Sequence, residues 1–243
     1  MGRGVSPPAT VTLRPGLAES FLEERVPDPK PEPGDLPEAA PRRPERIGVL
    51  GGTFDPPHVG HLWLATLAAD AMGLERVVFM PAAQPPHKQG QPITSAASRL
   101  LMTRLAIGAE GLFELSLIEM ERSGPSFTVD SVEELRALYE DASLFLVMAA
   151  DSLAQIDSWH EPDRLLSLIE WVVGPRPGAA PPDRAALHER FGPAAERIHL
   201  VNGPALDVSS SEIRQRVAAG RAIRYLVPRA VEELISEQHL YRP

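Results

Sequence analysis

Two histidines, His58 and His61, are the residues of this chain whose spacing best suits chemistry. They belong to the segment GGTFDPPHVGH, which follows the apolar run 47–50 and precedes the apolar-periodic segment 62–74. This order predicts a strand, a glycine-rich turn and the start of a helix. Positions i and i+3 at a helix start share a face, so both imidazoles can reach one ligand. Free N–H groups and the positive end of the helix dipole meet there as well, and together they favour a phosphate group.

The turn before the histidines supplies further candidate phosphate contacts, which are Gly51, Gly52, Thr53, Phe54 and Gly60. Gly60 places no side chain between the two histidines, which allows a phosphate to approach the backbone. Two histidines would also suit Zn²⁺, but the sequence offers no companion ligands at the usual spacing. We therefore expect no metal site built from protein side chains.

A second segment, VSSSEIR, begins at Val208 and opens another predicted helix. Serine is an ordinary N-cap residue, and capping accounts for part of this pattern. Three hydroxyls, on Ser209, Ser210 and Ser211, together with the guanidinium of Arg214, also form a strong phosphate grip at one helix start. We predict that this segment binds phosphate as well as capping its helix.

The two segments together resemble the signatures of the nucleotidylyltransferase superfamily, His-x-Gly-His and Ile-Ser-Ser-Thr-x-Ile-Arg. The stretch from Arg46 to Tyr241 resembles the bacterial nicotinate-nucleotide adenylyltransferases. The resemblance implies that the adenylyl group of ATP is transferred to nicotinate mononucleotide, giving deamido-NAD and pyrophosphate in NAD biosynthesis. It also implies that His58, His61 and Arg214 are the catalytic residues. Mg²⁺ would then be bound through the phosphates of ATP.

The resemblance adds two residues to the ATP side of the expected site. Lys88 follows the predicted strand 76–80 in a proline-stiffened loop through Ile93, where it would contact phosphate and where the loop could act as a mobile lid. By itself, such a lysine is more commonly a solvated surface residue. Arg176, in the run WVVGPRPG, would lie near the adenine at the end of another strand.

The acceptor side of the expected site rests on four residues carried over from the family. Thr128 would receive the nicotinate carboxylate at a helix start, Asp151 would contact a ribose, and Trp159 would stack on the pyridine ring. Without the resemblance, Thr128 and Asp151 are helix N-caps and Trp159 is a core residue. Phe127 and His160 stand where relatives usually have tyrosine, so stacking capacity is kept while a hydroxyl is lost at Phe127. Ala149 stands where relatives usually have glycine.

Composition limits the alternatives. The chain has 243 residues, no cysteine and a formal net charge of −9, which argues against a nucleic-acid-binding surface. A cysteine-free chain with no apolar run of membrane length and no secretory h-region is expected to be cytoplasmic, with no membrane partner. Residues 1–45 are rich in proline and poor in large apolar residues, so we expect a disordered extension before a domain at 46–243.

The domain is predicted to be an α/β doubly wound parallel sheet, the Rossmann-like nucleotidylyltransferase fold, because short strand patterns alternate with helical ones. Predicted strands are 47–50, 76–80, 113–118, 144–149, 171–174 and 197–201. Predicted helices are 61–72, 97–109, 130–139, 163–169, 183–191, 210–219 and 228–238. Ligands in such folds lie at the carboxyl ends of the strands, where the first segment falls.

Several other functions remain open from the sequence. A small adenylyltransferase could instead use phosphopantetheine or nicotinamide mononucleotide as its acceptor, and the chain could be a nucleotide-binding sensor without turnover. The run around Trp159 and the Lys88 loop argue against phosphopantetheine, and intact histidines with Arg214 argue against a sensor. The sequence does not decide the oligomeric state, and a homo-oligomer is possible.

Overall fold

A computed structural model describes residues 43–88, 90–109, 111–178 and 183–242. The predicted disordered extension at 1–45 therefore lies outside the described residues, apart from its last three positions. None of the described helices is long and apolar enough to cross a membrane.

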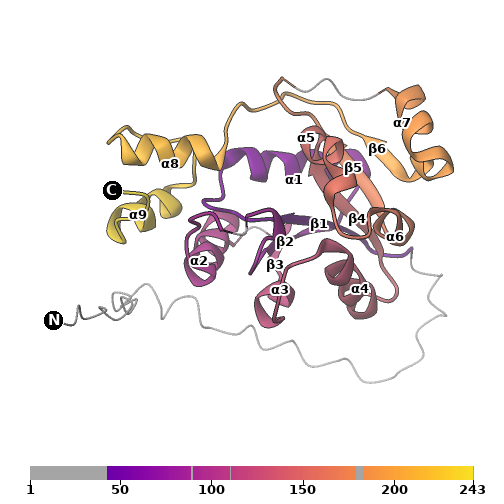
Figure 1. Ribbon diagram of the computed structural model, residues 1–243, viewed down its shortest axis with the longest axis horizontal. Coiled ribbons are helices and arrows are strands. Elements are labelled where there is room, and N and C mark those ends of the chain that lie inside the picture. Colours follow the sequence, from indigo (N-terminus) through magenta and orange to yellow (C-terminus); the bar gives the residue numbers. More distant parts are fainter. Residues whose placement is uncertain (1–42, 89, 110, 179–182, 243) are drawn as a thin grey trace, which may run out of the picture. The chain divides into compact units, whose positions relative to one another are not determined.

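The described strands form one parallel sheet in the order β3-β2-β1-β4-β5-β6 (Figure 1). Their bounds are β1 (Arg46–Gly52), β2 (Arg76–Pro81), β3 (Phe113–Leu115), β4 (Ser143–Ala149), β5 (Glu170–Gly174) and β6 (Ile198–Leu200). The chain order reverses between β1 and β4, which is the switch point where such sheets bind their ligands. The predicted doubly wound α/β fold is thus confirmed.

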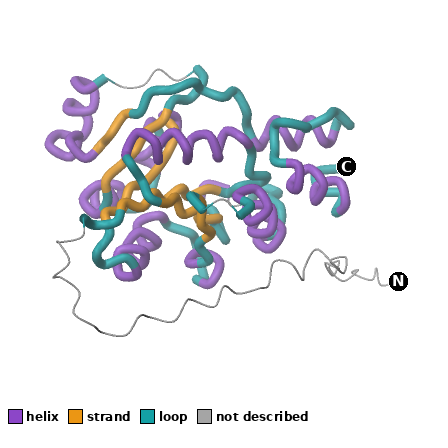
Figure 2. The backbone as a smooth tube through the Cα atoms, turned by 180° about the vertical axis from the view of Figure 1, so that it is seen from behind, coloured by secondary structure: helices purple, strands orange, loops and turns teal. Residues whose placement is uncertain are grey.

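Helices cover both faces of this sheet (Figure 2). They are α1 (Val59–Met72), α2 (Ala96–Ile107), α3 (Ile118–Glu121), α4 (Thr128–Leu138), α5 (Ala150–Ala154), α6 (Pro162–Leu168), α7 (Arg184–Phe191), α8 (Ser210–Ala218) and α9 (Arg229–Glu237). Short 3-10 turns are η2 (Pro86–Lys88), η3 (Ile156–Ser158) and η4 (Gly192–Arg197). The central strands β2 and β4 are buried along almost their whole length, because helices cover both faces of the sheet.

Three buried clusters hold these layers together. Alternate strand residues such as Ile47 and Val49 pack with α4, α6 and α7 on one face. The other face packs mainly on the alanines of α1. A third cluster joins α2 to α8 and α9 through residues such as Met102, Ile213 and Val231. The carboxy-terminal helices are therefore fixed to the sheet through α2.

The sequence located most elements but misplaced some of them. The predicted strand at 113–118 ends at Leu115, because Ile118 already begins α3. The short helices α3 and α5 were not predicted, since helices of one turn leave no periodic pattern to read. The expected helical residues Ala109, Tyr139 and Ile169 lie beyond the ends of their helices.

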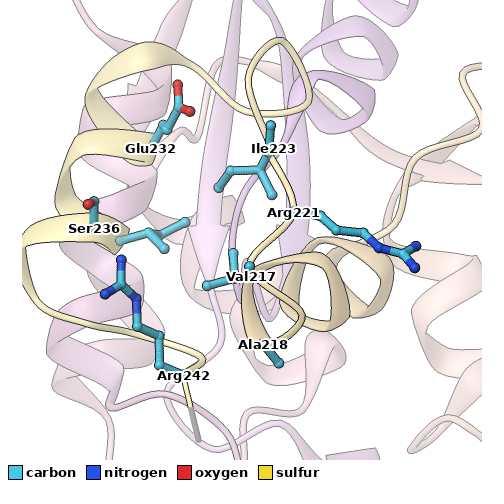
Figure 3. Close-up of a pocket in the computed structure, with 10 residues that line it drawn as sticks. Val217, Ala218, Arg221, Ile223, Glu232, Ser236 and Arg242 are labelled. Atoms are coloured by element: carbon cyan, nitrogen blue, oxygen red, sulfur yellow. The ribbon is translucent and has the colours of Figure 1, made fainter.

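One cavity of about 490 Å³ lies between α8 and α9 (Figure 3). Val217, Ile223 and Ile235 contribute apolar surface to it, and Arg221 and Arg242 contribute charge. No residue of the predicted site lines this cavity, and the predicted residues gather instead at the carboxyl end of β1.

Gly48 lies in the middle of β1, the strand between β2 and β4. A Cβ placed on it would lie 2.8 Å from Leu74 Cδ1 and 3.2 Å from Val77 Cγ2. We expect Gly48→Val to lower the free energy of unfolding by about 1–3 kcal/mol, because this core has no room for the added methyl groups. Urea unfolding measures the change. The matched control is Gly51→Val in the same strand, where the nearest atom to a Cβ is Met80 Cε at 3.6 Å. Equal losses in the two variants would contradict the packing argument.

Candidate active site

The β1–α1 junction holds both predicted histidines. His58 is the N-cap of α1 and is buried, whereas His61 lies in the first turn of the helix. Their rings stack with centroids 3.7 Å apart and an interplanar angle of 28°. The backbone N–H of His58 donates to Nδ1 of His61 at 3.1 Å. Because that Nδ1 accepts, the proton of a neutral His61 is on Nε2, which is then free to donate to a ligand.

Burial determines the charge of this pair. Desolvation, together with the positive charge of Arg176, lowers the pKa of His58 to about 4. The pKa of His61 also lies well below its ordinary value, through burial first and then the charges of His58 and Arg176. Both imidazoles are therefore neutral near pH 7. The buried Nδ1 of His58 has no hydrogen-bond partner within the described part of the chain, so a ligand could supply one.

The second predicted segment docks directly on the first. Ser210 Oγ donates to the carbonyl of Pro56 at 2.8 Å, and Arg214 Nη1 donates to the carbonyl of Asp55 at 2.7 Å. Ser209 caps α8 by accepting from the N–H of Glu212, as the sequence predicted. Arg214 also donates to Ser211 Oγ at 3.3 Å. The serines, Arg214 and the histidine turn thus form one site at the carboxyl end of β1.

The glycines and Phe54 shape the floor of this site. A Cβ on Gly60 would lie 3.0 Å from two atoms of the His58 ring, so a side chain there would crowd the imidazole. A Cβ on Gly52 would likewise lie 3.0 Å from the Phe54 ring. Phe54 is buried and packs edge-on against His61 at 5.0 Å. Its side chain supports His61, so only its backbone could contact a ligand. Gly51 is exposed, and Thr53 turns its carbonyl inward to Arg99.

Arg176 and Asp151 lie together next to the histidines. Arg176 follows β5, and its Nε lies 3.2 Å from Asp151 Oδ2, while its Nη1 donates to the carbonyl of Val208 at 3.3 Å. From the sequence, Arg176 was expected on the ATP side of the site and Asp151 on the acceptor side. The N-cap alternative for Asp151 is wrong, because α5 begins at Ala150 and Ala149 is its N-cap.

A second group of predicted residues surrounds the start of α4. Thr128 is the first residue of α4, so the alternative that it caps the helix is wrong, and Phe127 occupies the N-cap position. Phe127 stacks on His160 with ring centroids 4.1 Å apart. Two of the three departures from the family pattern, Phe127 and His160, therefore meet in one aromatic pair. Trp159, next to His160, is half-buried and packs against the core cluster.

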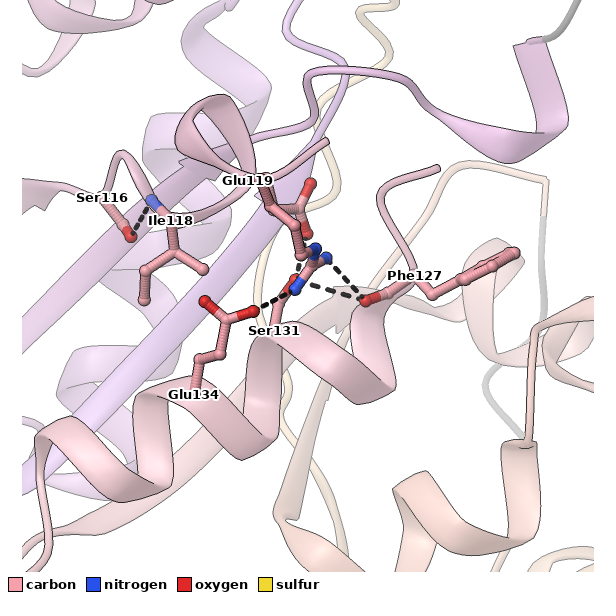
Figure 4. A network of polar contacts seen from close by, with 7 residues as sticks. Ser116, Ile118, Glu119, Phe127, Ser131 and Glu134 are labelled. Carbon is pink, nitrogen blue, oxygen red and sulfur yellow. Dashed lines mark hydrogen bonds and ion pairs between the residues drawn. The ribbon is translucent and has the colours of Figure 1, made fainter. Parts of the chain in front are cut away.

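A partly buried network of polar contacts fixes this turn (Figure 4). Glu119 on α3 is buried and accepts from Ser131 Oγ at 2.7 Å; burial raises its pKa. Arg122 donates to Ser131 Oγ and to the carbonyl of Phe127, and it forms an ion pair with Glu134 at 2.6 Å. The start of α4 is therefore held by charged side chains of α3 and of its C-cap residue, Arg122.

Within the described residues, no side-chain hydrogen bond or ion pair joins Lys88 to another predicted site residue. Lys88 ends η2, and its N–H donates to the carbonyl of Pro85 within the same loop. Among the described residues, no group of three or more His, Cys, Asp or Glu side chains could hold a metal ion.

Sequence reasoning missed four residues that shape the site. Asp55 stands inside the first segment but received no role, although it is buried and bonded on both its carboxylate and its carbonyl. Arg99, Glu119 and Arg122 were not singled out at all. A charged residue on an otherwise apolar helix face would have been the only signal for Arg99.

Comparison with known proteins identifies the family of this chain. The family model described as cytidylyltransferase-like matches residues 49–216. The chain therefore belongs to the cytidylyltransferase-like class of nucleotidyl-transferring proteins. A probable nicotinate-nucleotide adenylyltransferase of Thermomicrobium roseum is 46% identical over 197 residues, covering 81% of this chain and 92% of that protein. One from Exiguobacterium sibiricum is 44% identical, covering 81% and 98%. Within the class, this chain is a member of the nicotinate-nucleotide adenylyltransferase family.

Solved structures support the fold. Plasmodium falciparum nicotinic acid mononucleotide adenylyltransferase, in complex with NaAD, matches with a TM-score of 0.68. Its sequence identity is 19%, and the match covers 81% of this chain and 97% of that one. A likeness at this identity concerns the arrangement of the elements alone.

The lowered pKa of His58 predicts how stability depends on pH. The unfolded chain binds more protons than the folded one between pH 6.5 and about 4, so stability is lost as pH falls through that range. We expect His58 alone to account for about 3 kcal/mol of this loss, with His61 acting in the same direction. Urea unfolding at a series of pH values measures it. His58→Gln should show a flatter curve, and an unchanged curve would rule out burial of a neutral His58.

Proposed function

We propose that this protein transfers the adenylyl group of ATP to nicotinate mononucleotide, releasing pyrophosphate and forming deamido-NAD in NAD biosynthesis. One observation carries the proposal: the two signature segments dock on each other through Arg214 and Asp55, at the switch point of the sheet. Membership of the nicotinate-nucleotide adenylyltransferase family supports the choice of acceptor.

The proposed reaction needs positioning and charge stabilisation rather than a protein nucleophile. A phosphate oxygen of the mononucleotide attacks the α-phosphorus of ATP, the bond to the β-phosphate bridging oxygen breaks, and pyrophosphate leaves in line. Donors that meet the growing negative charge on the leaving group lower the barrier. In this proposal, Nε2 of His61 and the guanidinium of Arg214 would supply such donors at the carboxyl end of β1.

We propose the remaining roles on the same basis. The first-turn backbone at Gly51, Gly52, Thr53 and Phe54, with Gly60, would let the triphosphate approach the start of α1. The hydroxyls at the start of α8 and Lys88 would bind phosphate oxygens, and Arg176 would lie beside the adenosine with Asp151. Mg²⁺, bound through the phosphates of ATP, would neutralise part of their charge. The cytoplasm, where ATP and the mononucleotide are available, is the proposed compartment.

Acceptor-dependent pyrophosphate release, measured with ATP and Mg²⁺, tests this function. We expect release with nicotinate mononucleotide, and much less with nicotinamide mononucleotide or phosphopantetheine. Release with phosphopantetheine alone would assign the chain to a different adenylyltransfer. ATP binding without release for any of the three acceptors would instead indicate a nucleotide sensor.

His61→Ala should lower kcat by at least about 100-fold, because a lost transition-state donor costs about 2.7–4 kcal/mol. The fold should survive, since the substitution only removes side-chain atoms and Phe54, which packs against the ring, remains in place. Pyrophosphate release and thermal unfolding are measured on the same preparation. A matched control is His188→Ala on the exposed face of α7, which should keep wild-type turnover. A folded, fully active His61→Ala enzyme would overturn the role of the first segment.

The enzyme should prefer the acid to the amide of its acceptor. A carboxylate at the start of α4 can accept from backbone N–H groups that have no partner within the helix, and the helix dipole favours its charge. A carboxamide would turn its own N–H₂ group toward those donors, and such a mismatch costs roughly 1–3 kcal/mol. We therefore expect kcat/KM to favour nicotinate mononucleotide by about tenfold to a few hundredfold. Equal efficiency with the two mononucleotides would refute the placement of the pyridine ring near Thr128, while adenylyl transfer itself would stand.

A further inference from the structure

A fully buried arginine on α2 gathers main-chain carbonyls from three separate segments. Arg99 is 0% exposed. Its Nε donates to the carbonyl of Thr94 at 3.0 Å, and its Nη2 donates to that of Ala83 at 3.0 Å. Its Nη1 donates both to Ala82 and, at 2.9 Å, to Thr53. Only a guanidinium carries enough donors in a fixed plane to make all four bonds.

These carbonyls mark the two ends of the loop that carries Lys88. Ala82 and Ala83 precede the loop, and Thr94 follows it. The fourth carbonyl, at Thr53, belongs to the turn that leads into the histidines. Arg99 thus connects the base of the Lys88 loop to the phosphate-binding turn, although its side chain is itself buried away from the site.

Asp55 and Tyr241 complete the connection from the other side. The carboxylate of Asp55 is buried and accepts from the N–H of Thr94 at 3.2 Å and from the hydroxyl of Tyr241 at 2.7 Å. The carbonyl of Asp55 accepts from Arg214. Thr94 is therefore held at its N–H by Asp55 and at its carbonyl by Arg99. Burial and the neighbouring Asp55 carboxylate raise the pKa of Tyr241, so its hydroxyl keeps the proton that it donates.

Stability alone does not account for this arrangement. Burying a guanidinium and a carboxylate carries a desolvation penalty that apolar side chains of similar volume avoid. Burial lowers the pKa of Arg99, with the charge of Asp55 opposing that effect, which is the signature of such a penalty. Charged side chains hold several backbone carbonyls of the turn and the loop in fixed directions, which apolar side chains could not do.

We propose that Arg99 and Tyr241, acting with Asp55, are positioning residues that hold the Lys88 loop and the guanidinium of Arg214 in the geometry that ATP requires. This inference rests on the proposed function for the identity of the nucleotide. None of the three side chains needs to touch a substrate, since each acts through the backbone of the turn or of the loop. Their loss should consequently weaken ATP use while leaving the acceptor side intact.

The test compares Arg99→Lys and Tyr241→Phe with two matched controls. Arg184→Lys alters another arginine that holds two carbonyls, Ala195 at 2.9 Å and Ile198 at 3.1 Å, near η4 and β6. Tyr225→Phe alters a tyrosine that is 84% exposed. Thermal unfolding, KM for each substrate and the rate of trypsin cleavage after Lys88, with and without ATP, are measured for every variant.

For Tyr241→Phe we expect KM for ATP to rise about tenfold, as for one lost hydrogen bond to a charged group. KM for the mononucleotide should stay within about twofold, and trypsin should cleave after Lys88 several times faster. Arg99→Lys should have the larger effect on all ATP readouts. The controls should change KM for ATP and Lys88 cleavage by less than about twofold, whatever they do to the melting temperature.

A folded Tyr241→Phe variant with wild-type KM for ATP and wild-type cleavage after Lys88 would overturn the proposal. This variant decides the matter even if Arg99→Lys does not fold. Cleavage after Lys88 needs no acceptor, so it tests the positioning role independently of the proposed function. If the wild-type protein fails to use nicotinate mononucleotide but Tyr241→Phe still loosens the loop, the proposed function fails and the positioning role stands.

Discussion

The hydrogen bond from Arg214 to the carbonyl of Asp55 joins residues 159 positions apart, and the assembly of the candidate site depends on it. It fixes α8 against the β1–α1 turn, with help from the bond between Ser210 and Pro56. Without that contact, the serines and Arg214 would be the exposed start of a surface helix. With it, two segments far apart in the sequence lie against each other, and the second half of the candidate site is created by tertiary structure alone.

Electrostatics explains why the donors have to be assembled in this way. The chain carries a formal net charge of −9, so a polyphosphate gains nothing from its overall field. The candidate site instead combines two guanidinium groups that are already held in place and two imidazoles that burial keeps neutral. Arg176 is paired with Asp151, and Arg214 is held by a carbonyl and a hydroxyl. An arriving phosphate would favour the protonated form of the histidines, so its binding and their charge are thermodynamically linked.

How far the sequence could predict this depends on the range of each interaction. The six strands and the two signature segments were recognisable because apolar runs, glycines and caps are local signals, and Ser209 caps α8 as expected. Thr128 and Asp151 were misjudged as possible caps because a helix start is uncertain by a residue or two. The ion pair of Arg176 with Asp151 and the carbonyl contacts of Arg99 could not be predicted, since they join segments that the sequence does not show to be neighbours.

The three tryptophans have very different surroundings, and this has a practical consequence for spectroscopy. Trp171 is fully buried in the sheet, and its indole N–H has no partner within the described residues. Trp63 donates to the carbonyl of Pro204, on the loop that leads to α8. Trp159 is half-buried beside the Phe127–His160 pair. Intrinsic fluorescence can therefore be divided by site: the buried Trp171 is the reporter of global unfolding, whereas Trp63 and Trp159 report on the Pro204 loop and on the surroundings of the Phe127–His160 pair.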